Sequence, residues 1–239
     1  MHIEHSDFHD QFVRGLSHKM NNILSLFHGY LGLLLENEKL DSATLEGLAQ
    51  IKEGACAASE LMNRTNALAR PSSVIWREIN INDLVTSMRP MLLSYLNRGV
   101  VLEIKCAETL PSVWADASRL KTAVLEFVRN AGEASPEGGK VTLEVGCESP
   151  GAHIGPSSAA QPIKWVSITV TDHGEGVPEE LSEKIFNPFF STKHDQNSTG
   201  LGLTVALGLV QQLGGVIRVH SEPGQTAFRM LLPSRSERF

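Results

Sequence analysis

The chain has 239 residues, of which 41% are hydrophobic and 6% aromatic, so it can build one large or two small domains with an aliphatic core. Its formal charge of −6 argues against a general nucleic-acid binder, because such proteins are usually basic. No apolar stretch reaches the ~20 residues that span a bilayer, and none resembles a signal segment. Three widely spaced cysteines indicate inert thiols in a reducing compartment. The composition therefore predicts a soluble, cytoplasmic protein.

Residues 6–36 are predicted to form one long helix, because apolar side chains recur at steps of three and four residues. These apolar positions are Phe8, Phe12, Leu16, Met20, Ile23, Phe27, Leu31 and Leu34. After a polar break, Asp41 or Ser42 can cap a second helix that ends near Arg70-Pro71, giving an antiparallel hairpin. Because a lone hairpin leaves apolar surface exposed, we predict that two copies pair into a dimeric four-helix bundle.

The opposite face of the first helix is polar. Its members are Gln11, Arg14, His18, Asn22 and Ser25. His18 is therefore expected to face solvent, where a neutral imidazole can act as a nucleophile toward a phosphoryl group. Asn22 lies one turn later on the same face, and it could hold an attacking water or the phosphoryl group of a partner. Taken alone, His18 is more simply an ordinary surface histidine.

The segment around His18 reads Leu-Ser-His-Lys-Met-Asn-Asn-Ile-Leu over residues 16–24 and resembles the H-box of histidine kinases, especially the branch with His-Asp-Phe-Asn-Asn-Leu-Leu. The resemblance implies that His18 accepts a phosphoryl group and that Asn22 supports removal of phosphate from a response regulator. The family places an acid directly after the histidine, where it polarises the imidazole. Here Lys19 stands in that place, and a fixed cation cannot accept a proton at neutral pH.

After a predicted linker over residues 72–78, the pattern changes to alternating strands and helices. Strands are predicted over residues 76–81, 100–106, 112–115, 140–147, 165–171, 216–221 and 226–232. Asn82 or Asp83 is expected to cap a helix that runs through Leu96, and another helix is expected to start at Asp116. This order of elements predicts an α/β sandwich.

The helix that starts at Asp116 carries Glu126 and Asn130 one turn apart on the same face. Residues 126–134 read Glu-Phe-Val-Arg-Asn-Ala-Gly-Glu-Ala and resemble the N-box of the nucleotide-binding fold shared by sensor histidine kinases, gyrase-type ATPases and mismatch-repair ATPases. The resemblance implies that Asn130 coordinates Mg²⁺, through which the nucleotide phosphates are held. An amide oxygen is a suitable hard ligand for this ion.

Glu126 departs from the pattern of most histidine kinases of this branch, which carry a second asparagine at its position. Gyrase-type ATPases instead carry a glutamate there that activates water. One hypothesis is that Glu126 supplies, near the γ-phosphate, the base that Lys19 cannot supply. The alternative is a modest ligand substitution with no new role.

Two glycine clusters flank a polar segment between Asp172 and Leu203. Residues 172–178, 186–193 and 199–203 resemble, in this order, the G1, F and G2 boxes of the same fold. The resemblance implies that Asp172 accepts a hydrogen bond from the exocyclic amine of adenine. Gly174 and Gly176 would let the backbone approach the base closely.

The F and G2 boxes would cover the rest of the nucleotide. The resemblance implies that the aromatic residues of the F-box, Phe190 among them, pack the base of a lid, although Phe186 and Phe189 could serve only in the core. Lys193 would reach the terminal phosphate. The predicted residues over the phosphates, at the start of the next helix, are Thr199, Gly200, Leu201 and Gly202.

The resemblance covers about residues 12–232. It implies an α plus α/β protein with a dimerisation and phosphoacceptor domain over residues 1–73 and a catalytic ATP-binding domain over residues 74–239. The chain would pass the γ-phosphoryl group of Mg-ATP to His18, then to an aspartate of a response-regulator receiver domain docked near His18. We expect no nucleic-acid partner and any sensor to lie outside this chain. Two alternatives stay open: a dimeric phosphotransfer or phosphatase scaffold, favoured by Lys19, and a plain ATPase, favoured by Glu126.

Overall fold

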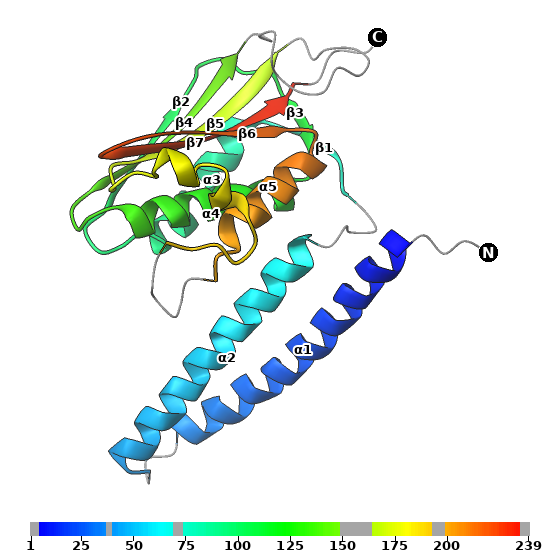
Figure 1. Ribbon diagram of the computed structural model, residues 1–239, viewed down its shortest axis with the longest axis vertical. Coiled ribbons are helices and arrows are strands. Elements are labelled where there is room, and N and C mark those ends of the chain that lie inside the picture. Colours follow the sequence, from blue (N-terminus) through cyan, green and yellow to red (C-terminus); the bar gives the residue numbers. More distant parts are fainter. Residues whose placement is uncertain (1–4, 37–39, 69–73, 149–163, 193–198, 235–239) are drawn as a thin grey trace. The chain divides into compact units, whose positions relative to one another are not determined.

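The computed structural model describes residues 5–36, 40–68, 74–148, 164–192 and 199–234. The chain divides into two compact units, Met1–Ser72 with Ser191–Leu201, and Ser73–Phe190 with Gly202–Phe239. The helices of the first unit form a hairpin, and the second unit is an α/β sandwich (Figure 1). The two kinds of architecture are those predicted from the sequence.

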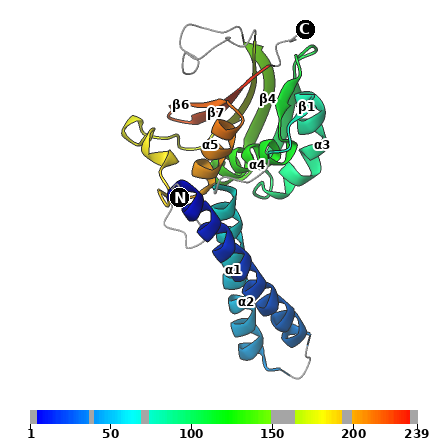
Figure 2. The same ribbon diagram turned by 90° about the vertical axis from the view of Figure 1, so that its right-hand side faces the viewer.

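The hairpin consists of α1 (His5–Leu35) and α2 (Ser42–Leu68), which lie side by side and antiparallel in both views (Figures 1 and 2). Asp41 caps α2, since its Oδ1 accepts the backbone N–H of Thr44 at 2.7 Å. The predicted start of the second helix is therefore confirmed, with Asp41 rather than Ser42 as the capping residue.

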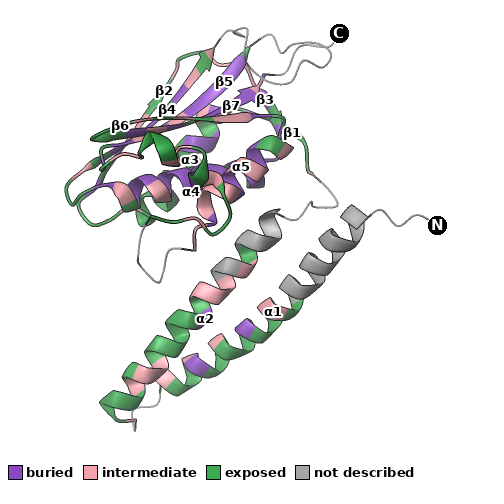
Figure 3. Ribbon diagram, in the orientation of Figure 1, coloured by how far each residue is buried: buried purple, intermediate pink, exposed green. Residues whose placement is uncertain are grey.

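The apolar stripe of α1 is only partly covered by α2. Much of the described part of α1 is exposed (Figure 3). Of the predicted stripe, Leu31 is buried but Phe27 is 51% exposed, and Leu24, which lies outside the predicted stripe, is buried. Two packed helices touch along a narrow line of residues, so a broad stripe keeps part of its surface exposed. The exposed large apolar residues of the described part of α1 are Ile23, Leu26, Phe27, Tyr30, Leu33 and Leu34.

The sandwich contains a five-stranded sheet in the order β2-β4-β5-β7-β6 and a two-stranded ribbon of β1 and β3. β2 runs parallel to β4, and all other neighbours in both sheets are antiparallel. The strands are β1 (Arg77–Ile79), β2 (Val101–Cys106), β3 (Val113–Ala115), β4 (Lys140–Glu148), β5 (Trp165–Asp172), β6 (Val216–Glu222) and β7 (Gln225–Pro233).

Three helices cover one face of this sheet: α3 (Ile81–Ser94), α4 (Ala117–Ala134) and α5 (Gly202–Gln212) (Figures 1 and 2). The core lies between the helices and the sheet, where the ring of Phe127 on α4 packs 5.5 Å from that of Phe228 on β7, centroid to centroid. The other face of the sheet carries exposed charged side chains such as Glu144 and Arg229. This alternation of apolar and polar side chains along the strands fixes which face the helices cover.

The N-terminal cap of α3 differs from the sequence prediction, whereas that of α4 agrees with it. α3 is capped by Asn80, whose side chain accepts the backbone N–H groups of Asn82 and Asp83, so the predicted caps at Asn82 or Asp83 are wrong. Asn82 instead donates its side-chain amide to the carbonyl oxygen of Ala107 at 2.8 Å. Asp116 caps α4 as predicted. Because the cap of α4 sets where this helix begins, it also sets the turn on which Glu126 and Asn130 stand.

Candidate nucleotide-binding site

Asp172 ends β5 and is almost fully buried, with 1% of its surface exposed. Its Oδ1 accepts the backbone N–H of Gly174 at 3.0 Å. A carboxylate has about four lone-pair sites on two oxygens, so this turn hydrogen bond does not exhaust its capacity to accept others. A buried acceptor discriminates between ligands, because a ligand without a matching donor leaves the carboxylate poorly compensated.

The glycines that follow Asp172 are required by the fold itself. A Cβ atom on Gly174 would lie 2.5 Å from the carbonyl oxygen of Ala134, at the end of α4. Gly176 has φ +88°, and a Cβ atom there would lie 2.6 Å from the carbonyl oxygen of Glu222. Both distances are shorter than real contacts allow, so only glycine lets this turn fit between α4 and β6. The tight turn in turn fixes the position of Asp172.

The N-box face of α4 carries a buried ion pair. Glu126 is 8% exposed, and its Oε2 lies 2.8 Å from Nη2 of Arg129. Nε of the same arginine lies 3.5 Å from Oε1 of Glu133, one turn further on. Asn130 is half-buried on the same helix. The pairing of Glu126 and Asn130 on one helix face agrees with the sequence prediction, and Arg129 is an additional member of this face.

The start of α5 meets this ion pair. Gly202 is the first residue of α5, and a Cβ atom on it would lie 2.8 Å from Oε2 of Glu126 and 2.9 Å from Nη2 of Arg129. Gly200 has φ +62°, a left-handed backbone that glycine adopts most readily. The first backbone N–H groups of a helix have no partner within the helix, so the start of α5 is suited to an anion such as phosphate.

The F-box segment before α5 is held by a side-chain hydrogen bond that sequence reasoning missed. Thr204 on α5 donates its hydroxyl to the carbonyl oxygen of Phe186 at 2.9 Å. Phe186 and Phe190 are half-buried, but Phe189 is 71% exposed and has φ +65°. A core role for Phe189 is therefore wrong. Its left-handed backbone is uncommon for a residue with a Cβ atom and indicates local strain.

Two predicted site residues are not described at the level of their side chains. His18 lies within α1, but its side chain is outside the described part, and so is all of Lys193. The neighbours of His18 are described: Lys19 and Asn22 are both exposed on α1. Asn21 donates its side-chain amide to Oδ1 of Asn63 on α2 at 3.1 Å. Of the predicted G2 residues outside the sandwich, Leu201 is buried and Thr199 is half-buried.

The residues present fit a nucleotide with Mg²⁺. No cluster of three or more His, Cys, Asp or Glu side chains arranged to hold a metal occurs in the described ranges. The amide oxygen of half-buried Asn130 is a suitable hard ligand for Mg²⁺, an ion that takes few protein ligands. Asp172 is a buried hydrogen-bond acceptor, and the first backbone N–H groups of α5 are donors of the kind that suits an anion.

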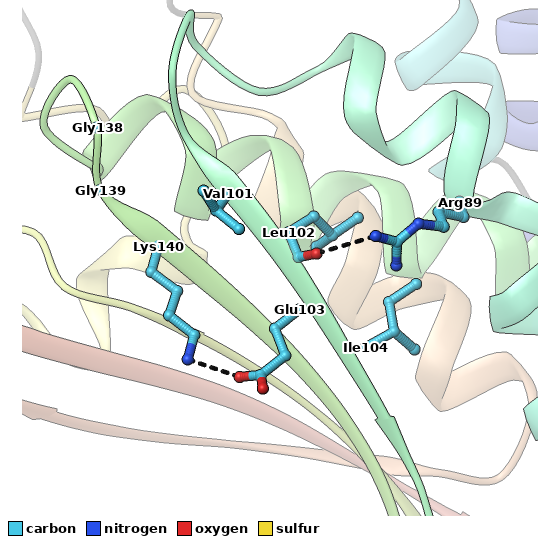
Figure 4. Close-up of a pocket in the computed structure, with 8 residues that line it drawn as sticks. All are labelled: Arg89, Val101, Leu102, Glu103, Ile104, Gly138, Gly139 and Lys140. Atoms are coloured by element: carbon cyan, nitrogen blue, oxygen red, sulfur yellow. Dashed lines mark hydrogen bonds and ion pairs between the residues drawn. The ribbon is translucent and has the colours of Figure 1, made fainter.

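A separate hollow of about 470 Å³ lies at the edge of the sheet (Figure 4). Its lining comes from α3, β2 and the turn before β4, with Arg89 reaching the carbonyl oxygen of Leu102 and Lys140 paired with Glu103 at 2.7 Å. None of the predicted nucleotide-binding residues lines it. The hollow is therefore distinct from the candidate nucleotide site.

Two contributors to the site were not predicted from the sequence, Arg129 and Thr204. The spacing of Glu126 and Arg129, three residues apart on a helix, is a recognisable ion-pair signal. Nothing in the sequence around Thr204 indicates that its hydroxyl reaches back 18 positions to Phe186.

Comparison with known proteins agrees with this geometry. The model of a family described as histidine kinase-, DNA gyrase B-, and HSP90-like ATPases matches residues 115–236. Sensor kinase CckA from Brucella abortus is 30% identical over 231 residues, which are 93% of this chain and 24% of that protein. Sensory histidine kinase/phosphatase NtrB from Azospirillum brasilense is 29% identical over 223 residues, which are 93% of this chain and 55% of that protein.

Among solved structures, full-length ShkA in complex with AMPPNP matches with a TM-score of 0.70 and 25% identity, covering 95% of this chain and 46% of that one. The chain thus spans between a quarter and somewhat over half the length of these curated relatives. No helix in the described part of the chain is long and apolar enough to cross a bilayer. The resemblance to the core of sensor histidine kinases is confirmed by these matches, which include the helical hairpin as well as the sandwich.

Proposed function

The chain belongs to the family of histidine kinase-, DNA gyrase B-, and HSP90-like ATPases, and from this membership we propose that it is the catalytic core of a sensor histidine kinase. The proposed domains are residues 1–73 for dimerisation and phosphate acceptance and residues 74–239 for ATP binding. The single observation that carries the proposal is the meeting of Glu126 on α4 with Gly202 at the start of α5. This contact supports the proposal, because it brings the polar face of α4 that carries Asn130 close to backbone N–H groups of the kind that suit phosphate.

The proposed reaction is transfer of the γ-phosphoryl group of ATP to His18. A ring nitrogen of His18 forms a bond to the γ-phosphorus while the bond to the β,γ-bridging oxygen breaks, and ADP leaves with that electron pair. Asp172 and the turn at Gly174 and Gly176 would orient the base, and Gly202 and its neighbours would hold the phosphates. Mg²⁺, when bound at Asn130, supplies charge neutralisation on the phosphates.

The remaining proposed roles lie at the terminal phosphate. Lys193 would neutralise charge there, since a lysine ammonium is a compact point charge suited to phosphate. Phe190, Thr199, Gly200 and Leu201 would close over the nucleotide. Glu126 is the proposed base, because its carboxylate lies beside the first residue of α5.

The proposed partners are a second copy of this chain and a response-regulator receiver domain. The exposed apolar side chains of α1, such as Phe27, Tyr30 and Leu33, favour pairing of two hairpins into a four-helix bundle. The receiver would dock near His18, where an oxygen of its aspartate carboxylate bonds to the phosphorus while the bond from the histidine nitrogen to phosphorus breaks. Exposed Asn22 would then help water remove the phosphate from that aspartate. NtrB of Azospirillum brasilense, a relative at 29% identity, is named a kinase/phosphatase.

Incubation with γ-labelled ATP tests the proposal. The wild-type chain should acquire an acid-labile label, and His18→Ala should lose it while binding ATP as tightly as the wild type. Asn22→Ala should keep the label on the kinase but slow loss of phosphate from a labelled receiver domain. Label that persists in His18→Ala would contradict His18 as the acceptor.

A second candidate is a phosphotransfer or phosphatase scaffold that binds ATP but does not phosphorylate itself well. Exposed Lys19 favours it, because the residue after the histidine is then a cation in the place of the family's acid. Lys19→Asp restores that acid. If the wild type binds ATP without acquiring label and Lys19→Asp labels strongly, the scaffold is the correct function. If the wild type labels as fast as Lys19→Asp, the scaffold is excluded.

A further inference from the structure

Three groups meet at one point of the candidate site: the Glu126 carboxylate, the Arg129 guanidinium and the backbone of Gly202. Oε2 of Glu126 and Nη2 of Arg129 are 2.8 Å apart. A Cβ atom on Gly202 would lie within 2.9 Å of both atoms. Gly202 is therefore needed to let an ion pair, and not merely a ligand, approach the start of α5.

A buried carboxylate at this point is a hazard for a phosphoryl-transfer enzyme. If the Glu126 carboxylate accepts a proton from water, the water oxygen can bond to the γ-phosphorus while the bond to the β,γ-bridging oxygen breaks. ADP then leaves with that electron pair, and free phosphate forms instead of phosphohistidine. A well-placed general base accelerates such a step by about 10²–10⁴-fold.

Arg129 holds this carboxylate in an ion pair. Its guanidinium binds Glu126 through Nη2, and its Nε faces Oε1 of Glu133 at 3.5 Å. The two glutamates lie on either side of Arg129 along α4, so the guanidinium bridges both of them. Because a buried carboxylate that loses its cationic partner is strongly destabilised, the pair with Glu126 is held firmly.

We propose that Arg129 is a positioning residue that fixes the Glu126 carboxylate on α4, where it serves as the base for the incoming histidine and is withheld from water, which reserves the γ-phosphoryl group for the histidine. The inference rests on the proposed function only in taking this site to bind ATP. Under this proposal, Arg129 decides whether the phosphoryl group goes to histidine or to water, although Arg129 need not contact the nucleotide.

The test measures phosphate release from ATP in a His18→Ala background, where transfer to that histidine is removed. Four chains are compared in this background: the parent, Arg129→Gln, Arg129→Gln with Glu126→Gln, and Lys121→Gln. Lys121→Gln is the matched control, because it removes an exposed cation from the same helix. Nucleotide affinity and melting temperature are recorded for each, so that a loss of folding or binding is seen directly.

We expect Arg129→Gln to raise phosphate release at least about tenfold per bound ATP, and the added Glu126→Gln to return it to the parent level. Release that is unchanged or lower in folded, ATP-binding Arg129→Gln, or that stays high after Glu126→Gln, would overturn the inference. If Arg129→Gln does not fold, Arg129→Lys keeps the positive charge without the guanidinium fork, and the same rise and reversal are required of it. If the wild-type chain acquires no label at His18, the proposed kinase function is refuted. The comparison of phosphate release among the four chains still tests the role of Arg129.

Discussion

Ile75 donates its backbone N–H to Oδ2 of Asp116 at 2.9 Å, so the residue that caps α4 also anchors the segment that enters β1. Oδ1 of the same carboxylate accepts the backbone N–H of Ser118 at 2.9 Å. One side chain therefore fixes both the start of the helix that carries Glu126 and Asn130 and the first strand of the sandwich. This double role has a consequence for stability in acid.

Asp116→Asn should weaken the acid dependence of folding. Burial opposes the charged form of Asp116, but hydrogen bonds from Ser118, Ile75 and Arg119 outweigh it and lower its pKa below the ordinary value of 3.8. A lowered folded pKa means that the stabilisation is complete above about pH 4 and is lost as the pH falls through the folded pKa. We expect Asp116→Asn to cost about 1 kcal/mol at pH 7 and less at pH 3.

Urea unfolding at both pH values measures this effect. Glu137→Gln, an exposed carboxylate outside the helices, is the control and should change the free energy of unfolding little at either pH. If Asp116→Asn lowers the free energy of unfolding as much at pH 3 as at pH 7, the charge of the carboxylate does not stabilise the cap.

Asp172→Ala should weaken ATP binding and remove the preference for adenine. A hydrogen bond that a buried carboxylate accepts contributes about 1.5–3 kcal/mol, so its loss corresponds to a loss of affinity of about 10- to 100-fold. Calorimetric titration with ATP and GTP checks both effects, and the melting temperature reports any damage to the turn at Gly174. Retention of a strong preference for ATP over GTP would exclude Asp172 as the reader of the base.

Phe27→Glu should dissociate the proposed dimer. Phe27 is an exposed aromatic residue on α1, and a carboxylate in the core of a bundle would be buried without compensation. Light scattering should then give a mass near 26.1 kDa for the variant and twice that for the wild type. Ser25→Glu adds the same charge at an exposed polar position two residues away and should leave the mass unchanged. A wild-type chain that scatters light with the mass of one copy would refute the dimer.

Gly174→Ala should destabilise the sandwich strongly, because its Cβ atom would lie 2.5 Å from the carbonyl oxygen of Ala134. Backbone must shift to relieve this contact, and overpacking of this kind costs about 1–3 kcal/mol. Gly54→Ala on α2 is the control: its Cβ atom meets nothing within 4 Å, and alanine stabilises a helix by up to about 1 kcal/mol relative to glycine. Opposite shifts in melting temperature are expected for the two variants.

The sequence was sufficient for the elements and their order, because long periodic runs and strong caps such as Asp41 and Asp116 determine them locally. It misplaced the cap of α3 because Asn80, Asn82 and Asp83 are all good capping residues, and only the tertiary contact of Asn82 with Ala107 separates them. The sequence pattern also did not separate the residues of α1 that pack on α2 from apolar residues of α1 that are exposed. Periodicity shows which residues are apolar, but not how wide the packed contact is.

The elements that carry the candidate site residues were predicted from the sequence, but the contacts between those residues were not. The motif residues Glu126, Asn130 and Asp172 stand where the N-box and G1 resemblance implied, on α4 and at the end of β5. The contacts that position them were not foreseen, because they join residues far apart in the chain. The packing of Gly174 on Ala134 and of Gly202 on the pair of Glu126 and Arg129 can be seen only once the chain is folded.

The hydrogen bond from Thr204 to Phe186 closes a loop whose ends are 18 positions apart. The bond ties the end of the F-box 3₁₀ turn to the first turn of α5, so one hydroxyl outside the recognised motifs links two segments of the candidate site. If this chain binds ATP as proposed, Thr204→Val should weaken that binding while leaving every predicted contact residue in place, as measured by calorimetric titration with ATP.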